Sequence, residues 1–241
     1  MTSETSACGC RPGLITIAID GFSSSGKSSM ARQLAKNIGY RYIDSGAMYR
    51  AVTLYALRHG LADTGSHKVD TAALTAALSS VHIDFNVSDS GQHTLLNGED
   101  VEREIRSMTV SEMVSEVAAI PEVRHARVRQ QQQFGREKGI VMDGRDIGTT
   151  VFPDAEMKVY VNASAQTRAQ RRLDELISKG VSTTFEEVLA NVIHRDHIDL
   201  TRAESPLRKA DDAVELDNST MTIDDQNHWL LDLYHSITGG C

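Results

Sequence analysis

The chain has 241 residues, of which 40% are hydrophobic and 24% charged, so it can form a packed core and is not disordered throughout. It contains no apolar run of 18 residues, which excludes a membrane span, and its first ten residues lack the pattern of a signal peptide. We therefore expect a cytoplasmic protein. The net charge of −8 argues against non-specific binding to nucleic acid or to acidic membranes.

The three cysteines lie at the two ends of the chain, at Cys8, Cys10 and Cys241. This placement excludes a disulfide framework in the core, and Cys8 and Cys10 lack the second pair of ligands that a zinc site needs. We expect mobile tails without a catalytic role, the first of them covering residues 1–13.

Short apolar segments alternate with amphipathic ones along most of the chain. In chain order the expected elements are a strand at 14–20, a helix at 29–38, a strand at 42–44, helices at 47–58, 71–78, 110–119 and 121–138, strands at 139–143 and 156–161, helices at 165–179 and 185–203, a strand at 213–216 and a helix at 223–237. Strands separated by helices predict a parallel sheet that is covered on both faces.

Several residues predict where these helices begin and end. Asp70 and Ser164 are suited to N-cap positions, and Pro121 suits a first helical turn. Thr183 and Glu186 have the spacing of a capping box for the helix near 185–203. Gly39 can end the first helix.

One segment departs from the alternation of strands and helices. Apolar residues recur at every second position from 81 to 87, a turn follows at 89–91, and residues 93–96 form another extended run. This is the pattern of a β-hairpin. We expect it to be the core of a small β-rich insertion near residues 80–101.

Residues 21–28, GFSSSGKS, fit the phosphate-binding pattern G-x-x-x-x-G-K-[ST] in full, between a predicted strand and a predicted helix. Gly21 and Gly26 permit backbone angles that let successive N–H groups point at phosphate oxygens. Lys27 supplies a charge to the β- and γ-phosphates, and Ser28 can bind Mg²⁺. Asp143, at the end of its strand, either joins the Mg²⁺ shell or caps the next turn. The motif indicates a nucleoside triphosphate without identifying the acceptor.

Arginines suit phosphoryl transfer, because the reaction depends on positioning and on cancelling the charge of the moving group. Taken singly, each could be a solvated surface residue. The arginines on the two helices within residues 165–203 flank a candidate hinge at 180–184. These helices either form a flap that closes over phosphates or have two salt-bridged surface faces. The candidates are Arg50, Arg124, Arg127, Arg145, Arg168, Arg171, Arg172, Arg195 and Arg202.

Five strings together resemble bacterial-type cytidylate kinases, a family of nucleoside monophosphate kinases within the P-loop kinases. They are IAIDGFSSSGKSS (17–29), YIDSGAMYRAV (42–52), DGRDIGTTVFPDA (143–155), RRLDEL (171–176) and RDHIDLTRAESPL (195–207). The resemblance implies transfer of the γ-phosphoryl group of ATP, with Mg²⁺, to CMP or dCMP. It also implies an α/β fold: a P-loop NTPase-type parallel sheet wrapped by helices, with a β-containing NMP-binding insertion and a helical lid.

The resemblance also implies how the chain divides. The kinase domain would cover residues 14–237, with its core at 14–60 and 139–237, an NMP-binding insertion at about 61–138 and a lid at about 168–205. We expect a monomer that binds ATP and CMP or dCMP. Many relatives have Pro where this chain has Phe22 and Gly where it has Ser28, but Ser28 is the usual Mg²⁺-facing residue of P-loop proteins.

Site residues carry over from the family's motifs. The implied catalytic residues are Lys27, Arg145, Arg171 and Arg202, and the implied metal ligands are Ser28 and Asp143. The implied ATP-binding residues are Gly21, Ser23, Ser24, Ser25, Gly26, Lys27, Ser28, Ser29, Arg171 and Arg172. The implied CMP-binding residues are Asp44, Ser45, Arg50, Ser115, Arg124, Arg145, Asp146, Arg195, Asp199 and Arg202.

Chemistry of the base supports this assignment, provided that Asp146 and Arg124 face it. A carboxylate suits the amino group at N4 of cytosine, and a guanidinium suits the acceptors N3 and O2. The alternatives are a kinase acting on UMP or AMP, a nucleotide-gated switch and a nucleic-acid-binding ATPase. The chain lacks the N-K-x-D string of guanine-reading switches, and its basic stretches lack interleaved aromatic residues.

Overall fold

The computed structural model describes residues 13–88, 91–178 and 180–239, so the three cysteines and residues 89–90 of the predicted turn lie outside the described residues. Five parallel strands form the central sheet in the order β10-β9-β1-β8-β2. They are β1 (Thr16–Gly21), β2 (Arg41–Asp44), β8 (Ile140–Gly144), β9 (Met157–Asn162) and β10 (Val214–Asp217). The five predicted strands and the parallel sheet are confirmed, each strand within two residues of its expected bounds.

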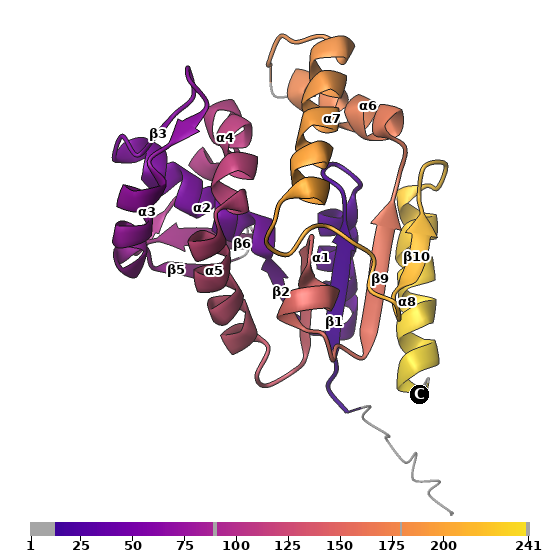
Figure 1. Cartoon of the computed structure of the whole chain (residues 1–241). Helices are drawn as coiled ribbons and strands as arrows, with labels where there is room; N and C mark the ends of the chain where they lie inside the picture. Colours follow the sequence, from indigo (N-terminus) through magenta and orange to yellow (C-terminus); the bar gives the residue numbers. More distant parts are fainter. Residues whose placement is uncertain (1–12, 89–90, 179, 240–241) are drawn as a thin grey trace, which may run out of the picture.

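Strand β1 is buried on both faces because its neighbouring side chains join different apolar clusters. Ile17 and Ile19 pack with α1 (Lys27–Ile38) and α8 (Ile223–Thr238). Ala18 belongs to the cluster formed with α2 (Ser45–Arg58), α4 (Met108–Ala119) and α5 (Pro121–Phe134). Both faces of the sheet are thus covered, as predicted (Figure 1).

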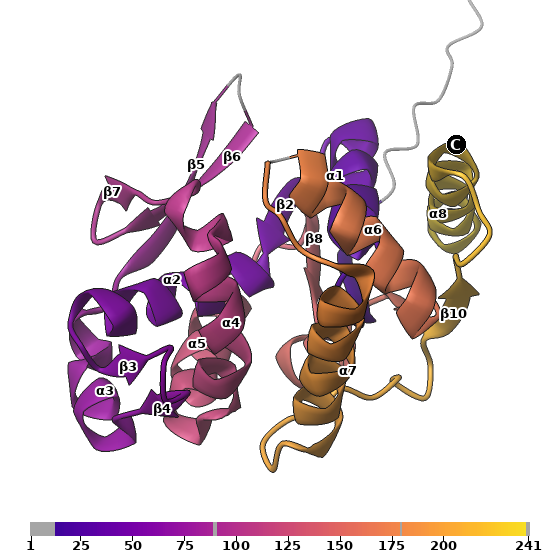
Figure 2. The ribbon, with the colours of Figure 1, turned by 90° about the horizontal axis from the view of Figure 1, so that it is seen from above.

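The β-rich insertion expected near residues 80–101 is present between α2 and α4, and in Figure 2 it lies on the side of the molecule opposite α8. The predicted hairpin is β5 (Ile83–Ser88) paired with β6 (Gly91–Leu96), and β7 (Glu99–Asp100) extends it to three strands. Two short pieces, β3 (Ala62–Asp63) and β4 (Lys68–Val69), form a pair that the sequence pattern did not predict. Helix α3 (Thr71–Ala77) and the short helices η1 (Leu78–Ser80) and η2 (Glu104–Arg106) complete the insertion.

Two helices, α6 (Ala165–Ser178) and α7 (Phe185–Thr201), lie above the carboxyl ends of the central strands (Figure 1). Ala169 and Leu176 of α6 pack with Val188 and Val192 of α7 in a cluster distinct from the two that flank the sheet. The pair therefore has its own small core. Among the described residues, no helix has the length and apolarity to span a membrane.

Most predicted helix ends are confirmed, and the residues that cap them are the expected ones. Asp70 accepts a hydrogen bond from the Ala73 N–H, and Ser164 accepts one from the Thr167 N–H. Pro121 begins α5, and Gly39, at φ 71°, ends α1. These caps fix the residues at which the helices begin and end.

One predicted capping box and one predicted helix end are wrong, although α7 begins at Phe185 as expected. The capping box of α7 is formed by Thr184 and Glu187 rather than by Thr183 and Glu186: the Thr184 hydroxyl accepts from the Glu187 N–H, and the Glu187 side chain accepts from the Thr184 N–H. The helix predicted at 121–138 ends at Phe134, and Lys138 adopts a φ of 56°, which a helix does not allow. A Cβ at Gly135 would lie 2.4 Å from the Phe152 ring, so any larger residue there would have to displace this ring.

Candidate active site

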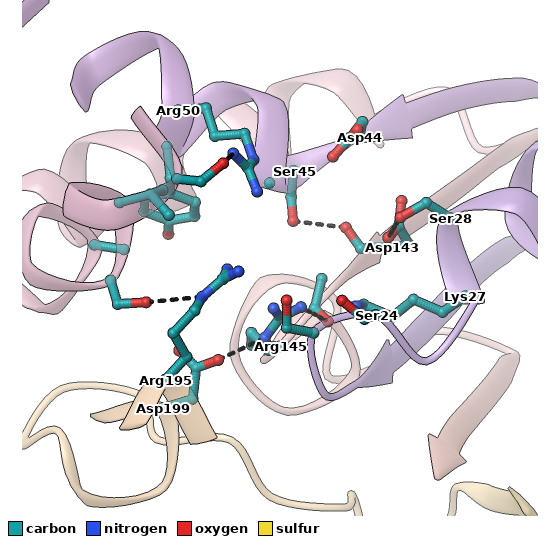
Figure 3. Close-up of a pocket in the computed structure, with 18 of the residues that line it drawn as sticks. Ser24, Lys27, Ser28, Asp44, Ser45, Arg50, Asp143, Arg145, Arg195 and Asp199 are labelled. Carbon is teal, nitrogen blue, oxygen red and sulfur yellow. Dashed lines mark hydrogen bonds and ion pairs between the residues drawn. The ribbon is translucent and has the colours of Figure 1, made fainter. Parts of the chain in front are cut away.

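A cavity of about 230 Å³ opens between the loop that joins β1 to α1, the insertion and helix α7. Its walls come from segments far apart in the sequence: the loop at Ser23–Ser28, helices α2, α4 and α5, the turn after β8, and helices α6 and α7. Figure 3 shows that charged side chains from the β1–α1 junction, α2, the end of β8 and α7 converge on one open space.

The loop after β1 has the backbone that its glycines were expected to allow. Gly26 has a φ of 88° and precedes α1 without any side-chain cap, so the first amide groups of that helix are available to a ligand. Gly21 serves a different need, because a Cβ there would lie 2.2 Å from the carbonyl oxygen of Val161 on β9. The loop therefore sits tightly on the sheet with its helix N-terminus open.

Lys27 is buried beneath this loop and donates a hydrogen bond of 2.9 Å to the carbonyl oxygen of Phe22. Burial above all, together with the nearby charge of Arg145, lowers the pKa of the Lys27 ammonium to about 7. An anion in the cavity would reverse this effect by favouring the charged amine.

Ser28 and Asp143 lie side by side at the end of β8. The Ser28 hydroxyl donates to Oδ2 of Asp143 over 2.7 Å, and the Tyr42 hydroxyl donates to Oδ1 over 2.7 Å. Burial and the neighbouring Asp44 raise the pKa of the Asp143 carboxyl. Hard oxygen donors of this kind suit Mg²⁺, which takes one or two protein ligands and completes its shell with phosphate and water. The described part of the chain holds no group of three or more candidate metal-binding side chains.

The opposite wall is formed by a buried ion pair. Nη2 of Arg124 lies 2.5 Å from Oδ2 of Asp146, and the two side chains are 1% and 4% exposed. Nη1 of Arg124 also donates to the carbonyl oxygen of Ala118 over 3.1 Å, and its guanidinium lies 5.2 Å from the centre of the Tyr49 ring. Ser115 joins this wall, and its hydroxyl accepts a bond of 3.4 Å from Arg195.

Arginines line the space between the loop and the buried ion pair. Arg145 donates to Asp199 over 2.8 Å, and Arg202 approaches the same carboxylate at 3.3 Å. Arg50 is held by the Ser111 hydroxyl at 2.9 Å, whereas none of the ion pairs within residues 13–88, 91–178 and 180–239 includes Arg50 or Arg195. In Figure 3 both of these guanidinium groups face the open centre.

Arg50 and Arg195 also have lowered pKa values. Burial lowers the pKa of Arg50 to about 9, with Arg195 as the next cause, and burial lowers the pKa of Arg195 to about 10, with Arg145 as the next cause. The protein thus holds like charges close together in a partly dry space. Such an arrangement favours the binding of an anion such as phosphate.

All ten residues predicted to bind CMP line this cavity, as do both predicted metal ligands. Of the residues predicted to bind ATP, only some reach it, and these are Ser23, Ser24, Lys27, Ser28 and Arg172. Gly21, Ser25, Gly26, Ser29 and Arg171 lie outside its lining.

Two arginines of α6 are held away from the cavity. Arg171 donates to the carbonyl oxygen of Ser25 over 3.2 Å and to that of Asn218 over 2.8 Å. Arg168 forms two bonds to Asp196, of 2.9 and 2.6 Å, which tie α6 to α7. Both therefore join α6 to its neighbours in this structure.

Several residues in or beside the site escaped sequence reasoning, and three of them are Tyr49, Arg106 and Asp20. Tyr49 and Arg106 line the cavity, and Arg106 lies 2.8 Å from Asp44. Asp20, at the end of β1, accepts backbone hydrogen bonds from Ile147 and Gly148 at 2.8 and 2.7 Å and so holds the turn that carries Arg145. Tyr49 stands within a quoted string, one residue before Arg50, but nothing in its spacing marks it. Arg106 belongs to no motif.

A parallel sheet with a phosphate-binding loop after its central strand, facing a wall of arginines, defines a P-loop phosphotransferase. The cytidylate kinase family model matches residues 17–236, and the chain therefore belongs to the cytidylate kinase family. This confirms the resemblance noted in the sequence.

Curated relatives agree with the family match. The chain is 59% identical to a cytidylate kinase of Bacteroides fragilis over 224 residues, which cover 91% of this chain and 96% of that protein. It is 56% identical to a cytidylate kinase of Parabacteroides distasonis and 58% identical to one of Porphyromonas gingivalis, in each case over 93% of this chain and 98% of the relative.

Proposed function

We propose that the cavity carries out the reaction of the cytidylate kinase family, with ATP at the β1–α1 loop and CMP or dCMP against the Arg124–Asp146 pair. The products are ADP and CDP or dCDP. The observation that carries this proposal is that one cavity joins the loop to the buried pair through a wall of arginines. The distribution of charge fits two nucleotides whose phosphates meet in the middle.

The donor side uses backbone amides and one ammonium. The open N-terminus of α1 and the residues Ser23–Ser29 would surround the β- and γ-phosphates of ATP, and Lys27 would place its charge against them. Arg171 and Arg172 remain predicted ATP ligands, which requires a movement of α6 for Arg171 because it now bonds to Ser25 and Asn218.

Magnesium fits the pair of oxygens at the end of β8. Ser28 and Asp143 would hold the ion together with phosphate oxygens of ATP, because their own oxygens already lie 2.7 Å apart. A bound ion would supply positive charge to the phosphate oxygens. Tyr42 and Ser45 keep this end of β8 in place, the first through the Asp143 carboxylate and the second through its carbonyl oxygen.

The acceptor side separates recognition of phosphate, ribose and base. Arg50, Arg145 and Arg202 would bind the acceptor phosphate. Arg195 and Asp199 would reach the ribose. Asp44 and Ser45 would lie at the end of the ribose that carries the phosphate. Asp146 would accept from the cytosine amino group, and Arg124 and Ser115 would bond the remaining edge of the base. The buried pair is already hydrogen-bonded, so its groups are held in place before a nucleotide binds.

The chemical step needs no general base, because the acceptor phosphate is already anionic near neutral pH. One of its oxygens forms a bond to the γ-phosphorus of ATP while the bond from that phosphorus to the bridging oxygen breaks. The electron pair leaves with ADP. The arginines would bind the charge that spreads over the moving group, which makes Arg145, Arg202 and, after a movement of α6, Arg171 our candidates for catalytic residues with Lys27.

The helical pair α6–α7 is the proposed lid. It has its own apolar cluster; α7 carries Arg195 and Asp199 into the cavity, and Arg202 follows directly after the helix. A rigid movement of this pair would bring those side chains toward the phosphates. We further propose a cytoplasmic monomer, in line with the sequence-based expectation.

An ADP-release assay with each nucleoside monophosphate tests the substrate. We expect release with CMP and dCMP, and release with AMP or GMP but not with CMP would contradict the proposal.

Lys27→Ala tests the donor side. We expect loss of turnover with the fold intact, while Lys36→Ala, an exposed lysine of the same helix, serves as the matched control and should retain full activity. Undiminished turnover in Lys27→Ala would refute the role of the loop.

A further inference from the structure

Tyr49 brings to the cavity a buried hydroxyl group that no partner satisfies. The residue lies on α2, lines the cavity and is 7% exposed. Its hydroxyl oxygen is shielded from solvent, and no atom in the described part of the chain forms a hydrogen bond with it. A buried hydroxyl without a partner is unfavourable for folding, so its presence needs a reason.

In the protein without substrate, the aromatic ring of Tyr49 makes a stabilising contact, but its hydroxyl group makes none. The guanidinium of Arg124 lies 5.2 Å from the centre of the ring, within the range of a cation–π contact. Phenylalanine would supply that contact equally well and would bury no unpaired polar atom. The contact with Arg124 thus explains why an aromatic ring stands at position 49, but it does not explain why the ring carries a hydroxyl group.

The Tyr49 ring packs on Arg124, which is paired with Asp146, so Tyr49 lies at the end of the cavity where the base is proposed to bind. Burial raises the pKa of Tyr49 to about 12, and the next largest influences are the charges of Asp146 and Arg124. The hydroxyl therefore keeps its proton at neutral pH and can both donate and accept a hydrogen bond. Arg124 has the same deficiency, because its Nε also lacks a partner.

We propose that Tyr49 is a further substrate-binding residue, whose hydroxyl bonds to the polar edge of the acceptor's base beside Asp146 and Arg124. This inference rests on the proposed function, since it assumes that the acceptor nucleotide occupies this cavity. Binding of the base would satisfy a hydroxyl that the free protein leaves unpaired. The hydrogen bond made by this hydroxyl would therefore stabilise the complex with substrate and would not contribute to folding.

Tyr49→Phe tests this role because it removes one oxygen and keeps the ring. We expect kcat/KM for CMP and for dCMP to fall about tenfold, in line with the loss of one buried hydrogen bond, while the KM for ATP stays unchanged. The melting temperature should stay the same or rise, since the variant buries one polar atom fewer. The matched control is Tyr55→Phe, on the same helix but outside the cavity lining, which should leave all of these values unchanged.

Three results would overturn the inference. Unchanged kcat/KM for both acceptors in Tyr49→Phe would mean that the hydroxyl bonds only to water. A fall for CMP but not for dCMP would place the hydroxyl at the ribose 2′ position, and a rise in the KM for ATP alone would place it on the donor side. Failure of the proposed function is recognised separately, because the unaltered protein would then show no turnover with CMP.

Discussion

Removal of the Asp146 carboxylate should damage both the stability of the protein and its recognition of CMP. In Asp146→Ala, Arg124 keeps its bond to the carbonyl oxygen of Ala118 but loses its charge partner, which lies 2.5 Å away. Arg124 is only 1% exposed, so water in the cavity compensates poorly for the lost carboxylate.

The size of the effect follows from this burial. Loss of one partner of a buried ion pair lowers the free energy of unfolding by about 3–5 kcal/mol. For a chain of this length, 1 kcal/mol corresponds to roughly 2–4 °C in melting temperature, so we expect a decrease of about 6–20 °C. Urea denaturation gives the free energy of unfolding and calorimetry the melting temperature.

A double variant separates stability from recognition. Arg124→Met combined with Asp146→Leu replaces the pair by apolar side chains, and such replacements of buried ion pairs are often neutral or stabilising. We expect it to recover most of the stability that Asp146→Ala loses and to lack turnover with CMP. A loss below about 1 kcal/mol in the single variant, or turnover with CMP in the double variant, would refute this reasoning.

Three further predictions concern Lys27, Ser28 and Asp20. Because the pKa of Lys27 is lowered to about 7 in the free protein and phosphate charge would raise it, ATP binding near pH 7.5 should take up a proton and weaken as the pH rises; calorimetry in two buffers of different ionisation heat measures this uptake, and equal heats would contradict it. Ser28→Ala should lower kcat roughly 10- to 100-fold and raise the Mg²⁺ concentration needed for half-maximal rate, whereas an unchanged Mg²⁺ dependence would contradict a ligand role. Burial raises the pKa of the Asp20 carboxyl to about 7, so the folded state binds its proton more tightly than the unfolded state, and the Asp20 contribution to stability falls as the pH rises from about 4 to 7. In Asp20→Asn the loss of stability between pH 5 and pH 8, measured by urea denaturation, should be smaller than in the unaltered protein, and an equal loss would contradict the assignment.

The central sheet could be predicted from sequence because its signals are local. Each strand is a short apolar run, and the loop at 21–28 carries a complete motif. The capping box of α7 was placed one residue too early because Thr183-Thr184 and Glu186-Glu187 offer the same spacing twice. The two registers are told apart only by the hydrogen bonds between Thr184 and Glu187 in the folded chain.

The acceptor side of the site was predicted through family motifs, and its members come together from α2, α4, α5, the turn after β8 and α7. Tyr49, Arg106 and Asp20 depend on packing in three dimensions. Nothing local in the sequence tells that Asp20 bonds to the backbone at Ile147 and Gly148, or that the Tyr49 ring packs on Arg124. Such contacts join residues that lie far apart in the chain, and so they require the fold.

A crystal structure of the protein with CMP and a non-hydrolysable ATP analogue would test the central claim most directly. We expect the triphosphate against the amides that follow Gly26, and the cytosine within hydrogen-bonding distance of both Asp146 and Arg124. Cytosine bound elsewhere, with the Arg124–Asp146 pair facing no part of either nucleotide, would contradict the account.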